Sequence, residues 1–424
     1  MRFLFVTPVE AGTGETLTAL RMAQYIVDTG DEVCFLASPF GKKFIEHGFP
    51  GKVELLEHDT GHKIDTWRSI LKRFQPHLIV FADYPLMFFT SGTATFVDED
   101  THLDILSETD AVLVTLDHTG FAQQGTGVFF GAPHLSFNYQ HWPDTPEFMR
   151  ILLPCPMNEP GILKDRKGEP FRYWDVPLSI SKKRRQEIRS RYLSRDDDFL
   201  IFHSVPNWAW RHAKDFQLPF YQYFAEILDF HLSGLSKPVT IVSVNNGQLL
   251  VPSKDSKNRY INSPLLSSHE YQELLLASDL MITENGISIS MGMAICGLVP
   301  CVSFRNSYHY RALRRQLTGK LREIVVAMEM LTMGSVFAWD IFPAGGKDVI
   351  EVLGLYRDNS IRDGMEVLEI FDEQETPLRL KSLLEDSSVR GRIKKQQQAY
   401  IEKMHRIPDA GRVLHQLCDN GGRI

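Results

Sequence analysis

Two series of alternating apolar runs and amphipathic stretches constrain the fold of this chain more than any other feature. The apolar runs are short and continuous, which is typical of strands buried on both faces of a parallel sheet. Alternation with helical stretches predicts a doubly wound α/β domain. In the first series we expect strands at 2–7, 32–37, 53–57, 77–82 and 111–116, and helices at 15–29, 42–47 and 65–74.

The second series begins after a connecting stretch, 121–175, which is rich in Gly, Pro and aromatic residues and is expected to form loops. A chain of 424 residues exceeds the usual size of a single core, so we expect two domains. The predicted fold class is α/β, with two doubly wound Rossmann-like domains facing a cleft. We place the first domain at 1–175, the second at 176–376, and C-terminal helices that pack back on the first domain at 377–424. The second series has predicted strands at 199–205, 239–244, 280–283 and 299–304, and helices at 216–231, 268–277 and 288–296.

Composition excludes several classes of protein. A hydrophobic share of 43% and a charged share of 23% are those of a globular protein. A net charge of -7 argues against nucleic acid as a partner, because a phosphate backbone requires a basic surface. No apolar run is long enough for an integral membrane segment, and the start is too short for a signal peptide, so we expect a cytoplasmic protein. The basic run 182–185 is expected on the solvated face of a surface helix. Five scattered cysteines indicate free thiols.

A candidate phosphate site lies where the strand 280–283 runs through a loop into the helix 288–296. The first turn of a helix leaves backbone N–H groups without intrahelical partners, and the helix dipole adds partial positive charge there. Gly286 lets a diphosphate approach closely. The same residues are also common in ordinary strand-to-helix turns. The candidate ligand-binding residues are Glu284, Asn285, Gly286, Ile287 and Ser288.

Two segments, 3–37 and 271–302, together resemble the GT-B glycosyltransferases that use nucleotide sugars. In that family a Gly-rich loop follows the first strand, and a second Gly-rich loop binds the nucleotide diphosphate. The resemblance implies transfer of a sugar from a nucleotide diphosphate sugar, the co-substrate, to a small-molecule acceptor, with no metal and no cofactor. Two departures stand out. Glu15 replaces the histidine of the family's usual Gly-His, and the donor helix has Met291 to Met293 where many members carry an acid.

Three residues are candidates for proton transfer. Glu15 takes the position of the customary base, and a buried carboxylate can act as a base if its pKa rises. Its alternative role is to complement the dipole in the first turn of its helix. Asp83 and His118 follow two predicted strands at their carboxyl ends, where open α/β sheets place ligands. His118 is placed to replace the missing imidazole, with Asp83 in support, although both residues also suit ordinary structural roles.

The resemblance also suggests residues that bind the two substrates. Arg211 offers a bidentate fork to a diphosphate, and Asn207 and Asn245 follow strands of the second series. Further candidates on the donor side are Gly14 and the loop residues named above. The candidates on the acceptor side are Glu10, Tyr84, Asp117 and His309.

Acidic clusters suggest a second class of site, because Asp-x-Asp holds a divalent ion in other glycosyltransferases. The clusters 98–100 and 196–198 have this spacing, but both lie in polar connecting stretches, so we expect solvated turns and no metal. His58 and His62 have the spacing of helical zinc ligands, but Thr60 and Gly61 are expected to break the helix.

The sequence therefore predicts a GT-B glycosyltransferase whose partners are a nucleotide sugar and a small acceptor. Two alternatives stay open. A hydrolase or epimerase of the same fold acts on the sugar nucleotide without a separate acceptor, and a non-catalytic binding or accessory protein has kept the fold without the base. The aromatic segment 129–142 lines an acceptor pocket or forms a subunit interface, which makes a homodimer one of the expectations.

Overall fold

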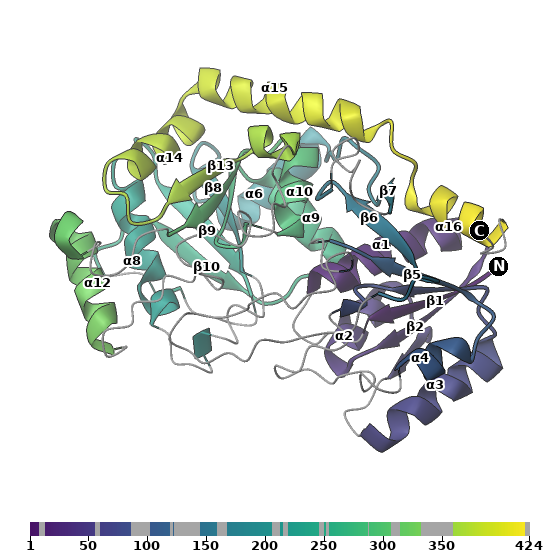
Figure 1. Cartoon of the computed structure of the whole chain (residues 1–424). Coiled ribbons are helices and arrows are strands. Elements are labelled where there is room, and N and C mark those ends of the chain that lie inside the picture. The colour runs from purple at the N-terminus through teal and green to yellow at the C-terminus, as the bar shows by residue number, and fades with distance from the viewer. Residues whose placement is uncertain are drawn as a thin grey trace. The chain divides into compact units, whose positions relative to one another are not determined.

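The structure, a computed structural model, contains two α/β units (Figure 1). The first unit holds the described residues of 1–175 and 403–424, and the second holds those of 176–402. The structure describes residues 1–7, 13–55, 60–85, 102–118, 122, 145–158, 168–205, 213–214, 219–245, 250–251, 254–286, 288–306, 314–331 and 359–419.

The first unit is built on a seven-stranded sheet in which all pairs are parallel, in the order β3-β2-β1-β4-β5-β6-β7. Buried aromatic rings of Phe5 and Phe35 stack across β1 and β2 with centroids 5.3 Å apart, so the sheet is covered by apolar side chains. The strands are β1 (Arg2–Thr7), β2 (Glu32–Ala37), β3 (Val53–Leu55), β4 (Leu78–Phe81), β5 (Val112–Leu116), β6 (Arg150–Cys155) and β7 (Glu169–Arg172).

Strands β6 and β7 correct the prediction that 121–175 forms only loops. Each contains a proline, Pro154 and Pro170 respectively. Because proline lacks the N–H that a sheet needs, its presence normally argues against a strand. Here the sheet accommodates both, and β7 lies at its edge.

The helices of the first unit begin near the carboxyl ends of strands, as a doubly wound topology requires. Ser38 caps α2, where its hydroxyl accepts a 3.1 Å hydrogen bond from the amide of Gly41. Helix α3 begins at Thr60, so Thr60 and Gly61 lie in its first turn, while His58 lies outside the described residues. Glycine is tolerated in a first turn. The helices are α1 (Thr13–Asp28), α2 (Pro39–Gly48), α3 (Thr60–Phe74), α4 (His102–Ser107) and α16 (Ala410–Asp419).

The second unit has a six-stranded parallel sheet in the order β10-β9-β8-β11-β12-β13. The two outer strands, β10 and β13, were not predicted. Both are partly polar, as edge strands commonly are, so they lack the apolar run that marks the inner strands. The strands are β8 (Phe199–Ser204), β9 (Val239–Val244), β10 (Arg259–Ser263), β11 (Leu280–Thr283), β12 (Cys301–Arg305) and β13 (Glu366–Glu369).

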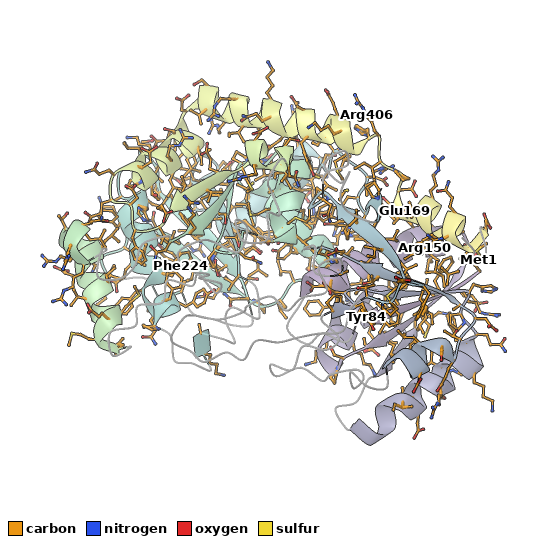
Figure 2. All side chains as sticks on the ribbon, in the orientation of Figure 1. Met1, Tyr84, Arg150, Glu169, Phe224 and Arg406 are labelled. Carbon is orange, nitrogen blue, oxygen red and sulfur yellow. The ribbon has the colours of Figure 1, made fainter. Side chains whose placement is uncertain are left out.

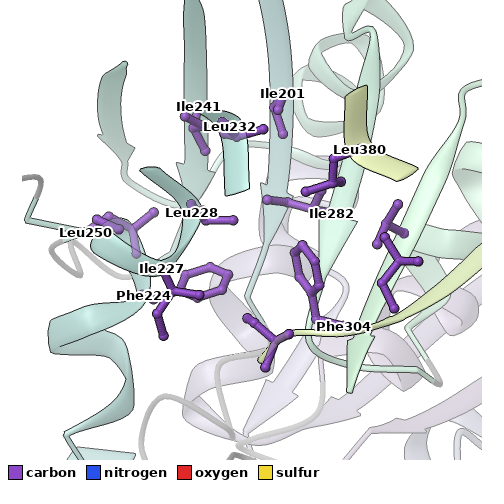
Figure 3. Packing of buried hydrophobic residues seen from close by; sticks show 14 of the residues in the cluster. Ile201, Phe224, Ile227, Leu228, Leu232, Ile241, Leu250, Ile282, Phe304 and Leu380 are labelled. Carbon is purple, nitrogen blue, oxygen red and sulfur yellow. The ribbon is translucent and has the colours of Figure 1, made fainter. Parts of the chain in front are cut away.

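One large apolar cluster packs the sheet of the second unit against its helices (Figure 3). Phe224 meets Phe304 edge to face, with ring centroids 6.3 Å apart. Leu380 and Leu384 belong to the same cluster. The helices are α6 (Lys182–Tyr192), α8 (Phe220–Leu232), α9 (Ser268–Ala277), α10 (Ile289–Cys296), α12 (Gly319–Leu331), the short 3-10 helix η3 (Ser360–Gly364), α14 (Glu375–Glu385) and α15 (Ser387–Met404).

The C-terminal segment is divided between the two units, which differs from the expectation for 377–424. Helix α14 packs on α8 and places buried leucines in the core of the second unit. The C-terminal segment belongs to the first unit only from residue 403 onward. Within that part, α16 packs on α1.

The basic run at the start of α6 is more than a solvated face. Arg184 forms an ion pair with Glu273 of α9, and Arg185 donates to the carbonyl of Leu276 at 2.8 Å. A cation at the C-terminal end of a helix complements its dipole. These arginines therefore fasten α6 to the end of α9.

Other expectations can be compared directly with the described residues. All five cysteines are free, as predicted.

Asp197 of the 196–198 cluster is paired with Arg195 and Lys237, at 3.2 and 3.3 Å. Within the described ranges, no group of three or more His, Cys, Asp or Glu side chains is arranged to hold a metal. Among the helices in the same ranges, none is both long and apolar enough to span a bilayer.

Candidate functional site

The carboxyl edge of the first sheet gathers buried polar residues. Thr7 ends β1, Asp83 lies two residues beyond β4, and Asp117 and His118 follow β5. Because neighbouring parallel strands end at the same edge of a sheet, these side chains share one region of the first unit. All four are buried, so the edge is a polar site enclosed by protein.

His118 is held by the first helix. Its Nε2 lies 3.1 Å from Oγ1 of Thr18, and that hydroxyl donates to the carbonyl of Gly14 at 3.1 Å. Since the Thr18 proton is used in this way, its oxygen accepts from His118, which assigns the proton of the ring to Nε2. Nδ1 is then an acceptor, and it is buried without a partner among the described residues. Burial lowers the pKa of His118 to about 4, so the ring is neutral near pH 7.

Glu15 lies in the first turn of α1, one turn before Thr18. The residue is only partly buried, but its Oε2 atom is enclosed and has no partner among the described residues. Burial raises the pKa of this carboxyl, and a backbone hydrogen bond offsets part of the change. A raised pKa is the direction that a general base needs to work near neutral pH.

The remaining candidates of the first unit are positioned by the backbone. Tyr84 is labelled in Figure 2. Its amide donates to Oγ1 of Thr115 at 3.0 Å, which fixes the turn that carries Asp83. Asn158 donates to the backbone carbonyl of Asp117 at 3.0 Å. Burial also raises the pKa of the Tyr84 phenol, so this side chain stays neutral.

The carboxyl edge of the second sheet contains a buried hydrogen-bond network that connects two of the predicted residues. Glu284 follows β11, and its Oε2 lies 3.0 Å from Nε2 of His203 in β8. The other ring nitrogen of His203 lies 3.0 Å from Oγ of Ser243, which accepts at 2.8 Å from Asn245. The hydroxyl of Tyr221, in α8, bonds the remaining oxygen of Glu284. Asn245 and Glu284 are thus joined through residues that the sequence did not single out.

The first turn of α10 has several of its amides already bonded within the chain. Ser288 is the N-cap, and its hydroxyl accepts from the amide of Ser290 at 3.2 Å. The amide of Ser288 donates to Asn285, and that of Met291 donates to the carbonyl of Ser288. A phosphate at this helix would have to replace the Ser288 cap or use other amides of the loop. Phosphate binding here stays a prediction.

Several predicted residues lie outside the described residues. In the first unit these are Glu10 and His58, together with the side chain of His62 and the 98–100 cluster. In the second they are Asn207, Arg211, Ile287 and His309.

The residues that the sequence analysis missed are His203, Ser243 and Tyr221 of the network and Thr18 beside His118. A usable signal was present for two of them. His203 and Ser243 are polar residues near the carboxyl ends of otherwise apolar strands, where a side chain without a partner would be costly. Tyr221 and Thr18 lie within helical patterns and give no comparable signal.

Two doubly wound parallel α/β units, each with buried polar residues at the carboxyl edge of its sheet, define a protein of the GT-B fold. The chain belongs to the family of unknown function DUF6365, whose match spans residues 22–422. No curated protein matches the sequence.

Solved structures support the fold over the whole length of the chain. The chain is similar to spinosyn rhamnosyltransferase SpnG complexed with thymidine diphosphate, with a TM-score of 0.54, 14% identity and coverage of 98% of this chain and 100% of that one. Spinosyn forosaminyltransferase SpnP gives a TM-score of 0.55 at 12% identity, with 100% of each chain covered. HepE from Anabaena, in complex with UDP-glucose, gives 0.53 at 13% identity, with 99% of each chain covered. At such identities the likeness concerns the fold.

Proposed function

We propose that this protein is a metal-independent glycosyltransferase that moves a sugar from a nucleotide diphosphate sugar to a small-molecule acceptor. The observation that carries the proposal is the pair of buried acceptor atoms without described partners, Glu15 Oε2 and His118 Nδ1, at the ligand-binding edge of a GT-B unit. Buried polar atoms normally have partners, so two such atoms at one edge suit a bound acceptor substrate that offers two O–H or N–H donors.

In this proposal the first unit holds the acceptor and the second holds the donor. The acceptor oxygen or nitrogen attacks the anomeric carbon while the bond to the nucleotide diphosphate breaks. Glu15 takes the proton, because its raised pKa suits a base near neutral pH. His118 is neutral, and its Nδ1 accepts a hydrogen bond from a second O–H or N–H group of the acceptor substrate. Arg211 and the start of α10 stabilise the leaving diphosphate.

Nucleotide binding is the first test. The purified protein is heated with UDP, TDP, GDP and CDP, each alone and as a sugar conjugate. A ligand present at about a hundred times its Kd stabilises the fold by about 2.7 kcal/mol. We expect one base to raise the melting temperature, and the shift to persist in EDTA. If no compound has an effect at millimolar concentration, the proposal fails.

Turnover separates transfer from hydrolysis. We expect release of the nucleotide diphosphate from the cognate sugar nucleotide to depend on an added acceptor library. Release at the same rate without any acceptor identifies a hydrolase, and interconversion of sugars without release identifies an epimerase.

A non-catalytic binding protein is the second candidate function. The observation that favours it is the first turn of α10, where the amides of Ser288, Ser290 and Met291 already have partners within the chain. Such a protein would show no turnover, and any stabilising ligand would be the acceptor-side compound alone.

We also propose a cytoplasmic location and no cofactor beyond the sugar nucleotide. The five free thiols support the location, because a reducing compartment preserves them. Treatment with a disulfide-forming oxidant is expected to leave the buried thiols of Cys296 and Cys301 unreacted in the native state, since burial raises the pKa of each.

A further inference from the structure

The loop between β11 and α10 in the second unit is fixed at its first residue by two neighbouring elements, α8 and β8. Glu284, 6% exposed, begins this loop. One of its carboxylate oxygens is bonded by Tyr221 of α8, and the other lies 3.0 Å from His203 of β8. Each of the two carboxylate oxygens of Glu284 is thus bonded by a side chain from a different neighbouring element.

The directions of these hydrogen bonds are consistent with a single arrangement. Burial raises the pKa of Tyr221, so its hydroxyl keeps the proton and donates to Glu284. Ser243 accepts from Asn245 and lies 3.0 Å from Nδ1 of His203. With its own proton the Ser243 hydroxyl can donate to Nδ1, which leaves Nε2–H to donate to Glu284. Every polar group in this chain of contacts has a partner, and a fully satisfied buried network favours one conformation.

The far end of the loop is fixed by a second set of contacts. Ser290 lies in the first turn of α10, and its hydroxyl is 2.6 Å from the hydroxyl of Tyr271 in α9 and 3.1 Å from that of Ser204 in β8. Tyr271 and Ser204 are themselves 2.7 Å apart, so the three hydroxyls form a closed triangle. In addition, Thr283 donates to the carbonyl of Ser204 at 2.9 Å and accepts from the amide of Asn285.

We propose that Tyr221, His203 and Tyr271 are positioning residues, which hold the 284–290 loop in its nucleotide-binding conformation before the nucleotide arrives. The ligand class rests on the proposed function, whereas the fixing of the loop does not. A loop that is ordered in advance does not have to lose conformational entropy on binding, so the networks increase affinity without touching the ligand.

The test compares single hydroxyl deletions with a matched control. Tyr221→Phe removes the bond to Glu284, and Tyr271→Phe opens the hydroxyl triangle, while each ring still fills its place. The control is Tyr260→Phe in the same unit, because the Tyr260 hydroxyl donates to the carbonyl of Ala225 and to Asp229, and neither residue belongs to the loop. Hydrogen exchange of the ligand-free proteins is followed at the amides of 285–291, and the Kd of each of UDP, TDP, GDP and CDP is measured for each protein.

We expect the loop amides to exchange about tenfold faster in Tyr221→Phe and Tyr271→Phe, with exchange in β8 and β9 unchanged, because one buried hydrogen bond is lost in each. The Kd of the nucleotide that binds wild type should rise about tenfold, and the KM for the donor should rise with little change in the KM for the acceptor. Tyr260→Phe should leave both readouts as in wild type.

Unchanged loop exchange in both variants, or an equal change in Tyr260→Phe, would overturn the positioning role. Faster loop exchange with an unchanged nucleotide Kd would also overturn it, because the loop would then be held for another reason. If wild type binds none of UDP, TDP, GDP and CDP, the ligand class and the proposed function fail together. In that case the exchange data alone still decide whether the networks hold the loop.

Discussion

Burial shifts the pKa values of Glu15 and His118, two candidate residues of the first unit, in opposite directions. It raises the pKa of the Glu15 carboxyl and lowers the pKa of the His118 imidazole, because it disfavours the charged form of each. Near neutral pH the ring is therefore uncharged, and the carboxyl is closer to its titration point than an exposed glutamate. Under the proposed function, this difference in pKa suits Glu15 to the role of base and His118 to the role of hydrogen-bond acceptor.

Changing Glu15 to Gln tests that assignment. We expect kcat to fall by about 10²–10⁴-fold, because Gln cannot take the proton of the acceptor. The free energy of unfolding of the variant should instead exceed that of wild type at high pH. A carboxyl whose folded pKa is raised contributes stability below its unfolded pKa and loses it as pH rises through the folded pKa, so the variant gains relative to wild type at pH 8. Urea unfolding at pH 4 and 8 checks this, with exposed Glu32→Gln as the control. An unchanged kcat would remove Glu15 from the mechanism.

His118→Gln tests the neutral imidazole through the pH dependence of stability. The folded pKa of about 4 is below the ordinary value of 6.5, so the stability that His118 contributes is present above about pH 6.5 and is lost as pH falls toward 4. Gln does not titrate. Urea unfolding of the first unit should therefore show wild type losing about 3 kcal/mol relative to the variant between pH 7 and pH 4.

The control for that measurement is His405→Gln, which changes an exposed imidazole in the same unit. If the difference between wild type and His118→Gln is the same at both pH values, the ring is not buried in its neutral form, and its assigned tautomer is wrong as well.

At the scale of elements, one carboxylate joins three parts of the second unit. Asp279 follows α9 and accepts from Arg189 of α6 at 2.8 Å, from Arg185 at 3.2 Å, and from the amide of Leu200 in β8 at 2.9 Å. Asp279→Asn weakens both ion pairs and presents an amide to the arginines. We expect a loss of about 1–3 kcal/mol in the unfolding free energy of the second unit, measured in urea. Exposed Asp255→Asn should change it by less than about 0.5 kcal/mol, and a similar small effect for Asp279→Asn would contradict this account.

The elements that the sequence predicted and those that it missed differ in one physical property. Inner strands such as β1 and β8 are continuous apolar runs, because both of their faces are covered by helices, and they were predicted within a residue. Strand β6 was hidden by Pro154, and β13 is a four-residue edge strand bounded by glutamates at both ends. Their positions follow from pairing with neighbouring strands, which is tertiary information that a local pattern does not contain.

The candidate sites show the same limit. Residues directly after a strand, such as His118 and Glu284, could be named from the sequence because topology alone brings them to a ligand-binding edge. Tyr221 is 63 positions from Glu284 and bonds it through the packing of α8 on the sheet. A hydrogen bond between elements so far apart depends on the three-dimensional packing, so the sequence alone could not predict this partner.

For the whole molecule, the path of the C-terminal segment decides which unit each helix stabilises. Helix α14 places its leucines in the core of the second unit, whereas α16 buries Val413 and Leu414 in the first. His415 of α16 lies 2.7 Å from Asp31 in the turn before β2. The first unit thus contains both ends of the chain, and the second unit lies between them in the sequence. Each unit is nevertheless a separate compact body of contacts.

Leu414→Ala tests this division. Leu414 is fully buried, so truncation leaves a cavity beside α1 and should cost the first unit about 2–5 kcal/mol. Hydrogen exchange resolves the two units in one experiment: amides of β1 and β2 should lose protection, and those of β8 and β9 should keep it. The matched control is Leu378→Ala on α14, where the side chain is 62% exposed and truncation should leave both units unchanged. Loss of protection in β8 and β9 with Leu414→Ala would mean that α16 stabilises the second unit as well, and that the two units unfold together.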